Sequence, residues 1–533
     1  MTGPFREKVK TFFSNRLLSA TFFITLILIG LSVFLVLCAK QSQGPYWLGQ
    51  NSDPDYCYLL NSCAIAQFHS PGLFGHPGTP LQVLGAIVVS VGHIFANTGI
   101  PLDQDIIERP EHYLDSISFV LNMCLLIGIL WLGISSYLST GFPALALFSM
   151  TAIFTSSAVL ASTVRVNPEP ALLLVALLLQ ISLVSTFKKD RNNDLTFIVF
   201  SCVVGLGIAT KVTFAPFAVI PIFILKGLKQ KLSYCAGTIV FFILFTLPAA
   251  VHYRAMAKWF LNLASHTGTY GYGPAGIINP VEYMTSLKSL FSAEPILFMS
   301  IVLGLTYLLT IFLHKNRDCG ADYLFRMLAA CLAGQLLSVL LVAKHPNQRY
   351  LVPALAFTGF NAGIMLMHAL MSFKNRKHLI SLIFLVYFLL LVSPAFRYQA
   401  TLSTMKTRKA DGVYLSSIAR NDSSAIKVFY YGASAIPFAL FFGNSYAGQR
   451  FSARLQSTYP ANIFYDPWGQ SFSDYTHTVP QNKLAIARNH QLLFQGYSFE
   501  TKGVVLGLQK PGFILNKIIE RSNEALYHSV TGD

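Results

Sequence analysis

Charged side chains are scarce in this chain. Asp, Glu, Lys and Arg make up 12% of its 533 residues, whereas apolar residues make up 53%. An ordinary soluble domain carries roughly 25% charged residues, so a soluble globular fold is excluded. Several apolar runs exceed the roughly 18 residues that a helix needs to cross a bilayer. The sequence therefore predicts a polytopic α-helical membrane protein.

Metal-ligand cysteine spacings and internal repeats are also missing. The eight cysteines are scattered along the chain, most of them in or beside apolar runs. Cys57 and Cys63 lie outside the runs, but on a helix their spacing turns them away from each other, so we expect no disulfide. These absences argue against a zinc module, a disulfide-stabilised domain and a repeat architecture.

Eleven apolar segments are predicted to cross the membrane. The first is too long for a signal-peptide core and lacks a small-residue cleavage site, so we expect it to be retained. The stretch Leu81–Ala96 is apolar but short, and we expect a juxtamembrane helix at the outer surface. The predicted spans lie near residues 17–38, 115–137, 142–162, 168–187, 195–209, 213–226, 232–251, 294–313, 323–343, 350–371 and 379–396.

The net charge of +16 comes largely from basic loops between these segments. With eleven spans, all of these loops fall on one side, which the positive-inside rule assigns to the cytoplasm. The charge therefore requires no nucleic-acid partner. The basic segments are 6–10, 188–191, 226–231, 314–317 and 374–377.

Two domains are predicted. A membrane domain covers 1–396, with a first outer loop at 39–114 that contains juxtamembrane helices, and an external C-terminal domain covers 397–533. The tail mixes polar, Gly and aromatic residues with strand-like runs such as 426–431 and 503–508, which favours a small α/β domain. The basic loops fit a bacterial inner membrane with this tail in the periplasm, although an endoplasmic reticulum protein would have the same polarity.

Two carboxylates, Asp53 and Asp55, follow the first span on the outer side. Asp53 suits a helix N-cap, Pro54 suits the first helical position, and Asp55 in the first turn favours the helix dipole. These structural roles would explain both residues. The alternative is that the helix start presents one carboxylate to a substrate as a base. If Asp53 is occupied as the cap, Asp55 is the freer group, and the sequence narrowly favours Asp55.

Several cations are predicted on the same outer side. His76 lies in the rigid turn 75–80, while Arg165, Lys211 and Arg349 lie in short turns. Each could reach lipid headgroups as an ordinary interfacial side chain, or could bind a phosphate group. Glu169 begins a predicted span, where it suits the helix dipole or contacts an acceptor or sugar. The Gly- and Tyr-rich stretch 266–274 fits either a mobile flap with sugar-stacking rings or a plain connection.

In this order the motifs resemble the glycosyltransferase C-fold superfamily, which includes protein O-mannosyltransferases and lipid A aminoarabinose transferases. The resemblance covers roughly residues 40–370. One departure is Pro54, which separates acids that are adjacent in many relatives and so leaves the base open between Asp53 and Asp55. The residues that carry the resemblance are Asp53, Asp55, Tyr56, Tyr58, His76, Pro77, Pro80, Glu108, Arg109, Thr210, Lys211, Arg349 and Tyr350.

The resemblance implies an inverting glycosyltransferase that uses a polyprenyl-phosphate sugar as donor. The acceptor hydroxyl would belong to a glycan, a lipid or a protein on the non-cytoplasmic face, and a first-loop aspartate would be the base. Such chemistry needs a carboxylate for the acceptor proton and cations for the phosphate. Donor phosphate contacts are expected from His76, Lys211, Arg349, Tyr350 and Arg165. Acceptor or sugar contacts are expected from Glu169, Tyr56, Tyr58, Glu108 and Arg109.

Other functions remain alternatives at this point. A transporter or flippase would show charges at mid-span and repeated halves, whereas here ionisable groups gather at one face. An O-antigen-ligase-like enzyme would carry a large, late outer loop rich in Arg and His, without the early aspartates. A non-catalytic scaffold is a third alternative. No cofactor is certain; the two carboxylates could hold a divalent cation, although their spacing does not require one.

Overall fold

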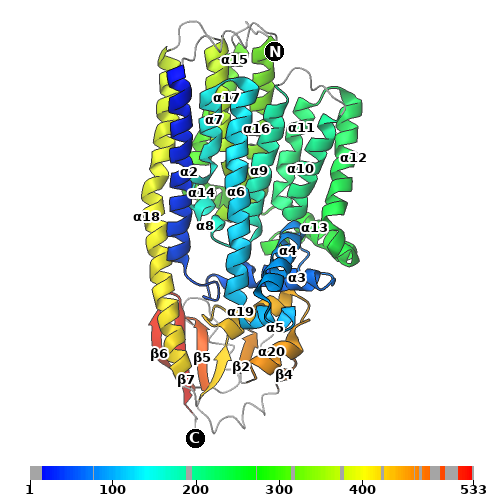
Figure 1. The fold of residues 1–533 in the computed structure, drawn as a ribbon, viewed down its shortest axis with the longest axis vertical. Coiled ribbons are helices and arrows are strands. Elements are labelled where there is room, and N and C mark those ends of the chain that lie inside the picture. The colour runs from blue at the N-terminus through cyan, green and yellow to red at the C-terminus, as the bar shows by residue number, and fades with distance from the viewer. Residues whose placement is uncertain are drawn as a thin grey trace.

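The computed structural model describes residues 15–75, 77–187, 195–271, 273–313, 319–372, 377–421, 425–460, 462–466, 471–479, 492–498 and 514–530. Within these ranges the chain forms a tall helical bundle with a sheet-containing part at one end (Figure 1). A layer of shorter helices, among them α3 (Ser52–Ala66), α4 (Thr79–Ala96) and α13 (Tyr253–Ser265), lies where the two parts meet.

Each of the eleven predicted spans coincides with a helix or with a bent helical segment. The long helices are α2 (Asn15–Gln43), α6 (Pro110–Thr140), α9 (Pro168–Ser185), α12 (Gly227–Thr246), α15 (Pro295–Leu313), α16 (Cys319–Ala343), α17 (Val352–Ser372) and α18 (Lys377–Asn421). The shorter pieces are α7 (Pro143–Ser149), η1 (Met150–Phe154), α8 (Ser157–Thr163), α10 (Thr196–Thr210), η2 (Val212–Ala218), α11 (Val219–Ile224) and η3 (Leu247–His252).

Within the described ranges, eight helices are long and apolar enough to cross a membrane, or up to nine if the bent pair 143–154 and 157–163 is one span. The predicted polytopic α-helical fold is therefore confirmed. Helix α4, which the sequence analysis does not count as a span, is one of these eight, yet Figure 1 places it beside α3 at the lower end of the bundle. That is the region in which the sequence predicts a juxtamembrane helix.

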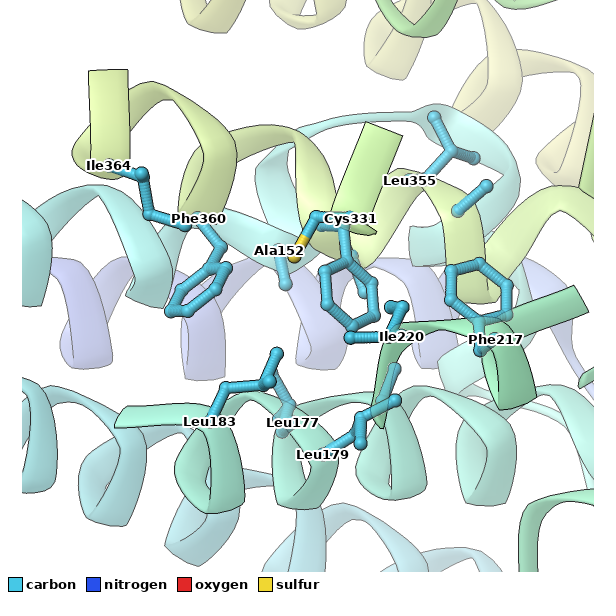
Figure 2. Close-up of a cluster of buried hydrophobic side chains, with 14 of the residues drawn as sticks. Ala152, Leu177, Leu179, Leu183, Phe217, Ile220, Cys331, Leu355, Phe360 and Ile364 are labelled. Atoms are coloured by element: carbon cyan, nitrogen blue, oxygen red, sulfur yellow. The ribbon is translucent and has the colours of Figure 1, made fainter. Parts of the chain in front are cut away.

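Helix α9 lies at the centre of the bundle because it is apolar on all sides. Its Leu177, Leu179 and Leu183 are buried together with Phe217 of η2 and Phe360 of α17, and Figure 2 shows these side chains in one cluster. Packing on all sides fixes α9, and with it the residues at its first turn.

The remaining helices lie in the connections between the long helices. They are α5 (Leu102–Glu108), η4 (Thr269–Gly271), α14 (Pro280–Ala293) and η5 (Gln348–Leu351). The loop before α14 is closed by a bridge between His266 and Ala275 and by Gly273 N–H, which donates to the carbonyl of Thr267 at 2.8 Å. The stretch predicted as a flap or a connection is thus a hairpin-like loop in its described residues.

The C-terminal part holds a seven-stranded sheet in its described residues, with strand order β4-β3-β2-β1-β5-β7-β6. The central strand β1 pairs in parallel with both β2 and β5, and the other pairings are antiparallel. The predicted run 426–431 contains β1, while 503–508 lies outside the described residues. The elements are β1 (Ile426–Phe429), α19 (Ile436–Tyr446), α20 (Ser452–Thr458), β2 (Asn462–Asp466), β3 (Ser471–Ser473), β4 (Thr478–Val479), β5 (Leu492–Tyr497), β6 (Ile514–Arg521) and β7 (Glu524–Val530).

The predicted domain boundary at 396–397 falls inside α18. This helix runs from the bundle, beside α2, down to the sheet, where it lies against β6 and β7 (Figure 1). The first strand begins only at Ile426. The division of the chain into two domains stays a prediction.

One hydrophobic cluster joins the first outer loop to the C-terminal part. Tyr46, Leu48 and Tyr56 of the loop are buried in the same cluster as Phe438 of α19 and Phe464 of β2. A shared core gains its burial energy only when both partners are docked. The C-terminal part is therefore packed on the loop that carries the two aspartates.

Candidate active site

Asp55 is fixed by a buried ion pair. It lies in the first turn of α3, and its Oδ2 accepts a hydrogen bond from Arg165 Nε at 2.6 Å. The backbone N–H of Val166 donates to the other carboxylate oxygen. Burial raises the pKa of Asp55, and the guanidinium of Arg165 and this N–H oppose the rise. The carboxylate is thus completely buried and occupied by several donors.

Asp53 has the opposite environment. Its backbone is extended, with φ −104° and ψ 121°, so regular helix begins only after it. The residue is exposed, and within the described part of the chain its carboxylate makes no hydrogen bond or ion pair. The extended backbone is that of an N-cap, as the sequence predicts, but its side chain does not cap the helix. This carboxylate is the accessible one of the pair.

Arg165 organises the loop that carries both acids. Besides its bond to Asp55, its Nη2 donates to the backbone carbonyls of Asn51 at 2.6 Å and Asp53 at 2.7 Å. These contacts engage Nε and Nη2 of the guanidinium, and binding of the donor phosphate by Arg165 stays a prediction. Its position also determines where Asp53 lies.

A second charged group forms at the start of α9. Glu169 Oε1 lies 2.6 Å from Lys211 Nζ and 4.0 Å from Arg349 Nε. The side chains of Glu169 and Lys211 are 1% and 7% exposed, whereas that of Arg349 is 31% exposed. Two cations around one carboxylate leave a net positive charge, and Arg349 is the cation that faces open space.

Tyrosine side chains cover this cationic group. Lys211 Nζ lies 4.2 Å from the ring centroid of Tyr350, which is a cation–π contact. The hydroxyl of Tyr350 is 3.2 Å from that of Tyr270, a residue of the hairpin-like loop before α14. Burial raises the pKa of Tyr270 to about 12, and the negative charge of Asp53 adds to the rise. The loop therefore reaches the site through Tyr270.

The charges of the acidic and the cationic groups both act on Tyr58. Burial raises its pKa most, the charges of Glu169 and Asp53 raise it further, and Arg349 opposes them. The charge of Asp53 also acts on Arg349. Both groups therefore lie within electrostatic range of one another. His76, predicted to bind the donor phosphate, lies outside the described residues.

Tyr56 is buried away from open space, although the sequence analysis predicts a contact with acceptor or sugar. Its hydroxyl donates to Glu111 Oε1 at 2.8 Å, and Glu111 Oε2 accepts from the backbone N–H of Tyr46 at 2.8 Å. These bonds attach α3 to the start of α6. Tyr56 therefore has a structural role here.

Glu108 and Arg109, also predicted as contacts, belong to a separate cluster. Arg109 Nε donates to Asp105 at 2.7 Å, and Glu108 accepts a bond from Gln104 at 2.8 Å. Burial raises the pKa of Asp105, but hydrogen bonds, including those from Tyr113 and Arg109, outweigh it and lower the pKa to about 2. This cluster joins α5 to α6, and the structure does not bring it together with Glu169 or Lys211.

The charge of Asp53 also acts on tyrosines of the C-terminal part, which the sequence analysis does not predict. Burial raises the pKa of Tyr431 and of Tyr446, and it raises the pKa of Tyr497 to about 12; the charge of Asp53 adds to each rise. The only sequence signal is that Tyr431 ends the strand-like run 426–431. A strand-like run in the sequence does not indicate which end of the strand lies next to the helical bundle.

No group of three or more His, Cys, Asp or Glu side chains that could hold a metal ion occurs among the described residues. The divalent cation that the sequence leaves open stays an untested prediction.

The long helical bundle, the helices in its connections and the C-terminal sheet define an integral membrane protein whose fold, as the resemblance implies, is like that of two solved structures. The crystal structure of ArnT from Cupriavidus metallidurans bound to undecaprenyl phosphate is 12% identical, with a TM-score of 0.50, and the match covers 94% of this chain and 97% of that one. The apo crystal structure of the same ArnT is 12% identical, with a TM-score of 0.51, and the match covers 96% and 98%. At this identity the likeness establishes the fold alone. No protein-family model and no curated protein matches the chain.

Proposed function

We propose that this chain is an inverting glycosyltransferase. It moves a sugar from a polyprenyl-phosphate donor to an acceptor hydroxyl on the non-cytoplasmic face of the membrane. The observation that carries the proposal is that an exposed carboxylate, Asp53, lies in electrostatic range of a net positive group at the same end of the bundle. The likeness in fold to an ArnT that binds undecaprenyl phosphate supports this donor class.

Asp53 is the proposed base, because Asp55 has no free lone pair directed to open space. The carboxylate of Asp53 takes the proton of the acceptor hydroxyl while that oxygen attacks the anomeric carbon of the donor sugar. The bond between this carbon and the phosphate oxygen breaks, and the polyprenyl phosphate leaves with the electron pair. Attack opposite the leaving group inverts the anomeric centre. A positioned base typically contributes about 10²–10⁴-fold.

Arg349 is the proposed main contact of the leaving phosphate. Its guanidinium is the more exposed of the two cations, and Arg can bind phosphate through two parallel hydrogen bonds. Lys211 adds positive charge from below the ring of Tyr350. Glu169, predicted from sequence as an acceptor or sugar contact, instead holds Lys211 in place, because it is buried against the lysine.

Arg165 and Asp55 are proposed as positioning residues. Their ion pair fixes the loop backbone at Asn51 and Asp53, so that the carboxylate of Asp53 projects into the site. The proposed location is a bacterial inner membrane, with the site and residues 397–533 in the periplasm. The basic connections of the sequence support that orientation.

Binding of undecaprenyl phosphate to the purified protein in lipid nanodiscs tests the donor class. We expect wild type to bind it and Arg349→Ala to bind at least 10-fold more weakly, which corresponds to about 1.4 kcal/mol. Arg326→Ala is the matched control, since Arg326 forms an exposed pair with Asp322 within α16, and it should bind as wild type does. Equal binding by wild type and Arg349→Ala would overturn the assignment.

A further inference from the structure

The C-terminal part approaches the aspartate loop too closely for any side chain to fit between them. A Cβ added at Gly49 would lie 1.8 Å from the carbonyl oxygen of Gly432. The N–H of Gly49 donates to Ser434 Oγ at 3.0 Å, and this hydroxyl donates to Glu524 Oε2 at 2.5 Å. The loop backbone four residues before Asp53 is thus anchored on the sheet.

Helix α19 forms a second close contact. A Cβ at Gly443 would lie 2.7 Å from the carbonyl oxygen of Tyr56, and one at Gly72 would lie 2.7 Å from that of Tyr446. Asn61 of α3 donates to the same Tyr446 carbonyl at 3.2 Å. The end of α19 is therefore fixed against α3, the helix that begins next to Asp53.

Three tyrosines from separate segments lie within electrostatic range of Asp53. Tyr270 comes from the hairpin-like loop, Tyr431 follows β1, and Tyr446 ends α19. Burial raises the pKa of all three, and the charge of Asp53 adds to each rise. Tyr270 and Tyr446 are 41% and 44% exposed, so their rings face open space.

The chemistry of these three tyrosine side chains fits a sugar ring. Tyrosine presents an apolar face and a hydroxyl that donates and accepts hydrogen bonds, which matches the apolar ring faces and the hydroxyls of a sugar. Binding of a peptide by strand addition beside Tyr431 would need an unpaired strand edge, but β1, which leads to Tyr431, is paired on both sides. The tyrosines add no positive charge that would attract an anionic acceptor.

We propose that Tyr431 and Tyr446 of the C-terminal part form the acceptor subsite, and that the acceptor hydroxyl belongs to a sugar ring. This inference rests on the proposed function, in which Asp53 takes the acceptor proton. The C-terminal part then supplies half of the active site: the acceptor lies between its tyrosines and Asp53, and the donor phosphate lies at Arg349.

Binding to an array that carries bacterial cell-envelope glycans and Ser/Thr-rich peptides tests the inference. We expect labelled wild-type protein in nanodiscs to bind glycans, and Tyr431→Ala and Tyr446→Ala to lose at least 10-fold of the signal. Tyr446→Phe, which keeps the ring, should retain part of it. Tyr414→Ala is the matched control, because Tyr414 is similarly exposed, at 47%, but lies on α18. It should bind as wild type does.

Undecaprenyl phosphate binding to the same preparations separates the two proposals. We expect Tyr431→Ala and Tyr446→Ala to bind it as wild type does, which also shows that they are folded. Three results would overturn the acceptor subsite and leave the donor proposal standing, provided that undecaprenyl phosphate binding is normal. The wild type binds no glycan, it binds peptides instead of glycans, or both alanine variants bind glycans as wild type does. If wild type does not bind undecaprenyl phosphate, the proposed function itself fails.

Discussion

Arg165 and Asp55 form a buried ion pair at 2.6 Å between Nε and Oδ2, although 110 residues separate them in the sequence. The same guanidinium holds the backbone carbonyl of Asp53. The two aspartates therefore have different roles, because one carboxylate cannot be both buried in an ion pair and exposed. Asp55 is neutralised and fixes the loop, while Asp53 keeps an exposed carboxylate.

Replacement of Arg165 by Met should destabilise the protein strongly. It leaves the Asp55 carboxylate buried without a counter-charge, which costs about 3–5 kcal/mol when one partner of a buried pair is removed. Thermal unfolding in nanodiscs measures the loss. Lys40→Ala, which breaks the more exposed pair with Asp115, is the control and should cost less than about 1 kcal/mol. Equal melting temperatures for Arg165→Met and Lys40→Ala would contradict the role of Arg165.

Glu169→Gln should destabilise the protein, and binding of the donor lipid phosphate should restore part of the lost stability. The change leaves Lys211 and Arg349 close together without their shared counter-ion. An added phosphate anion supplies that charge, and ligand binding to the folded state raises stability. We expect undecaprenyl phosphate to raise the melting temperature of Glu169→Gln more than that of wild type. A smaller rise in the variant would show that the phosphate does not bind beside these cations.

Gly49→Ala should separate the aspartate loop from the sheet. The new Cβ would collide with the carbonyl oxygen of Gly432, and overpacking of this kind costs about 1–3 kcal/mol. The measurement is the melting temperature, together with the rate of proteolysis between α18 and the sheet. Gly30→Ala is the control, since no atom lies within 4 Å of a Cβ at that position. Similar values for both variants would mean that the loop does not depend on this contact.

Glu524 should make stability depend on pH. Burial raises its pKa from 4.5 to about 7, so the folded state binds a proton more tightly than the unfolded state does. The contribution of Glu524 to the free energy of unfolding is therefore most favourable at low pH. It is lost as the pH rises from the pKa of the unfolded state, 4.5, through the pKa of the folded state, about 7. Between pH 5.5 and 8 the loss is about 2 kcal/mol for a shift of this size.

Glu524→Gln should remove this loss, because the amide does not ionise and can keep the contacts to Ser434 and Gln495. The melting temperature of the variant, compared with that of wild type, should therefore be relatively higher at pH 8 than at pH 5.5. A difference between the two proteins that stays constant over this range would show that Glu524 does not titrate there.

Much of the fold could be predicted from sequence, because lipid imposes a minimum length on every apolar span. The cationic residues Lys211 and Arg349 were identifiable because each ends or begins a span on the predicted outer side. The sequence did not, however, indicate that Glu169 is buried between them, since this depends on how α9, α10 and α17 pack.

The division of roles between the aspartates could not be predicted, because it depends on Arg165 and on the packing of α3 against the start of α9. Local helix rules favoured Asp55 as the aspartate with the accessible carboxylate. In the structure, tertiary contacts bury Asp55, and the carboxylate of Asp53 is the exposed one. The tyrosines of the C-terminal part were missed for the same reason. Tyr446 ends an ordinary apolar helix, and it is the contacts of its carbonyl with Gly72 and Asn61 that show that it lies beside the segment 39–114.

The most direct test compares Asp53→Asn with wild type in a strain that lacks the gene. Cell-envelope glycans are analysed by mass spectrometry, and both proteins are first shown to reach the membrane in equal amounts with equal melting temperatures. We predict that wild type restores a mass increment of one sugar and that Asp53→Asn does not. Full restoration of that increment by Asp53→Asn would contradict the assignment of Asp53 as the base.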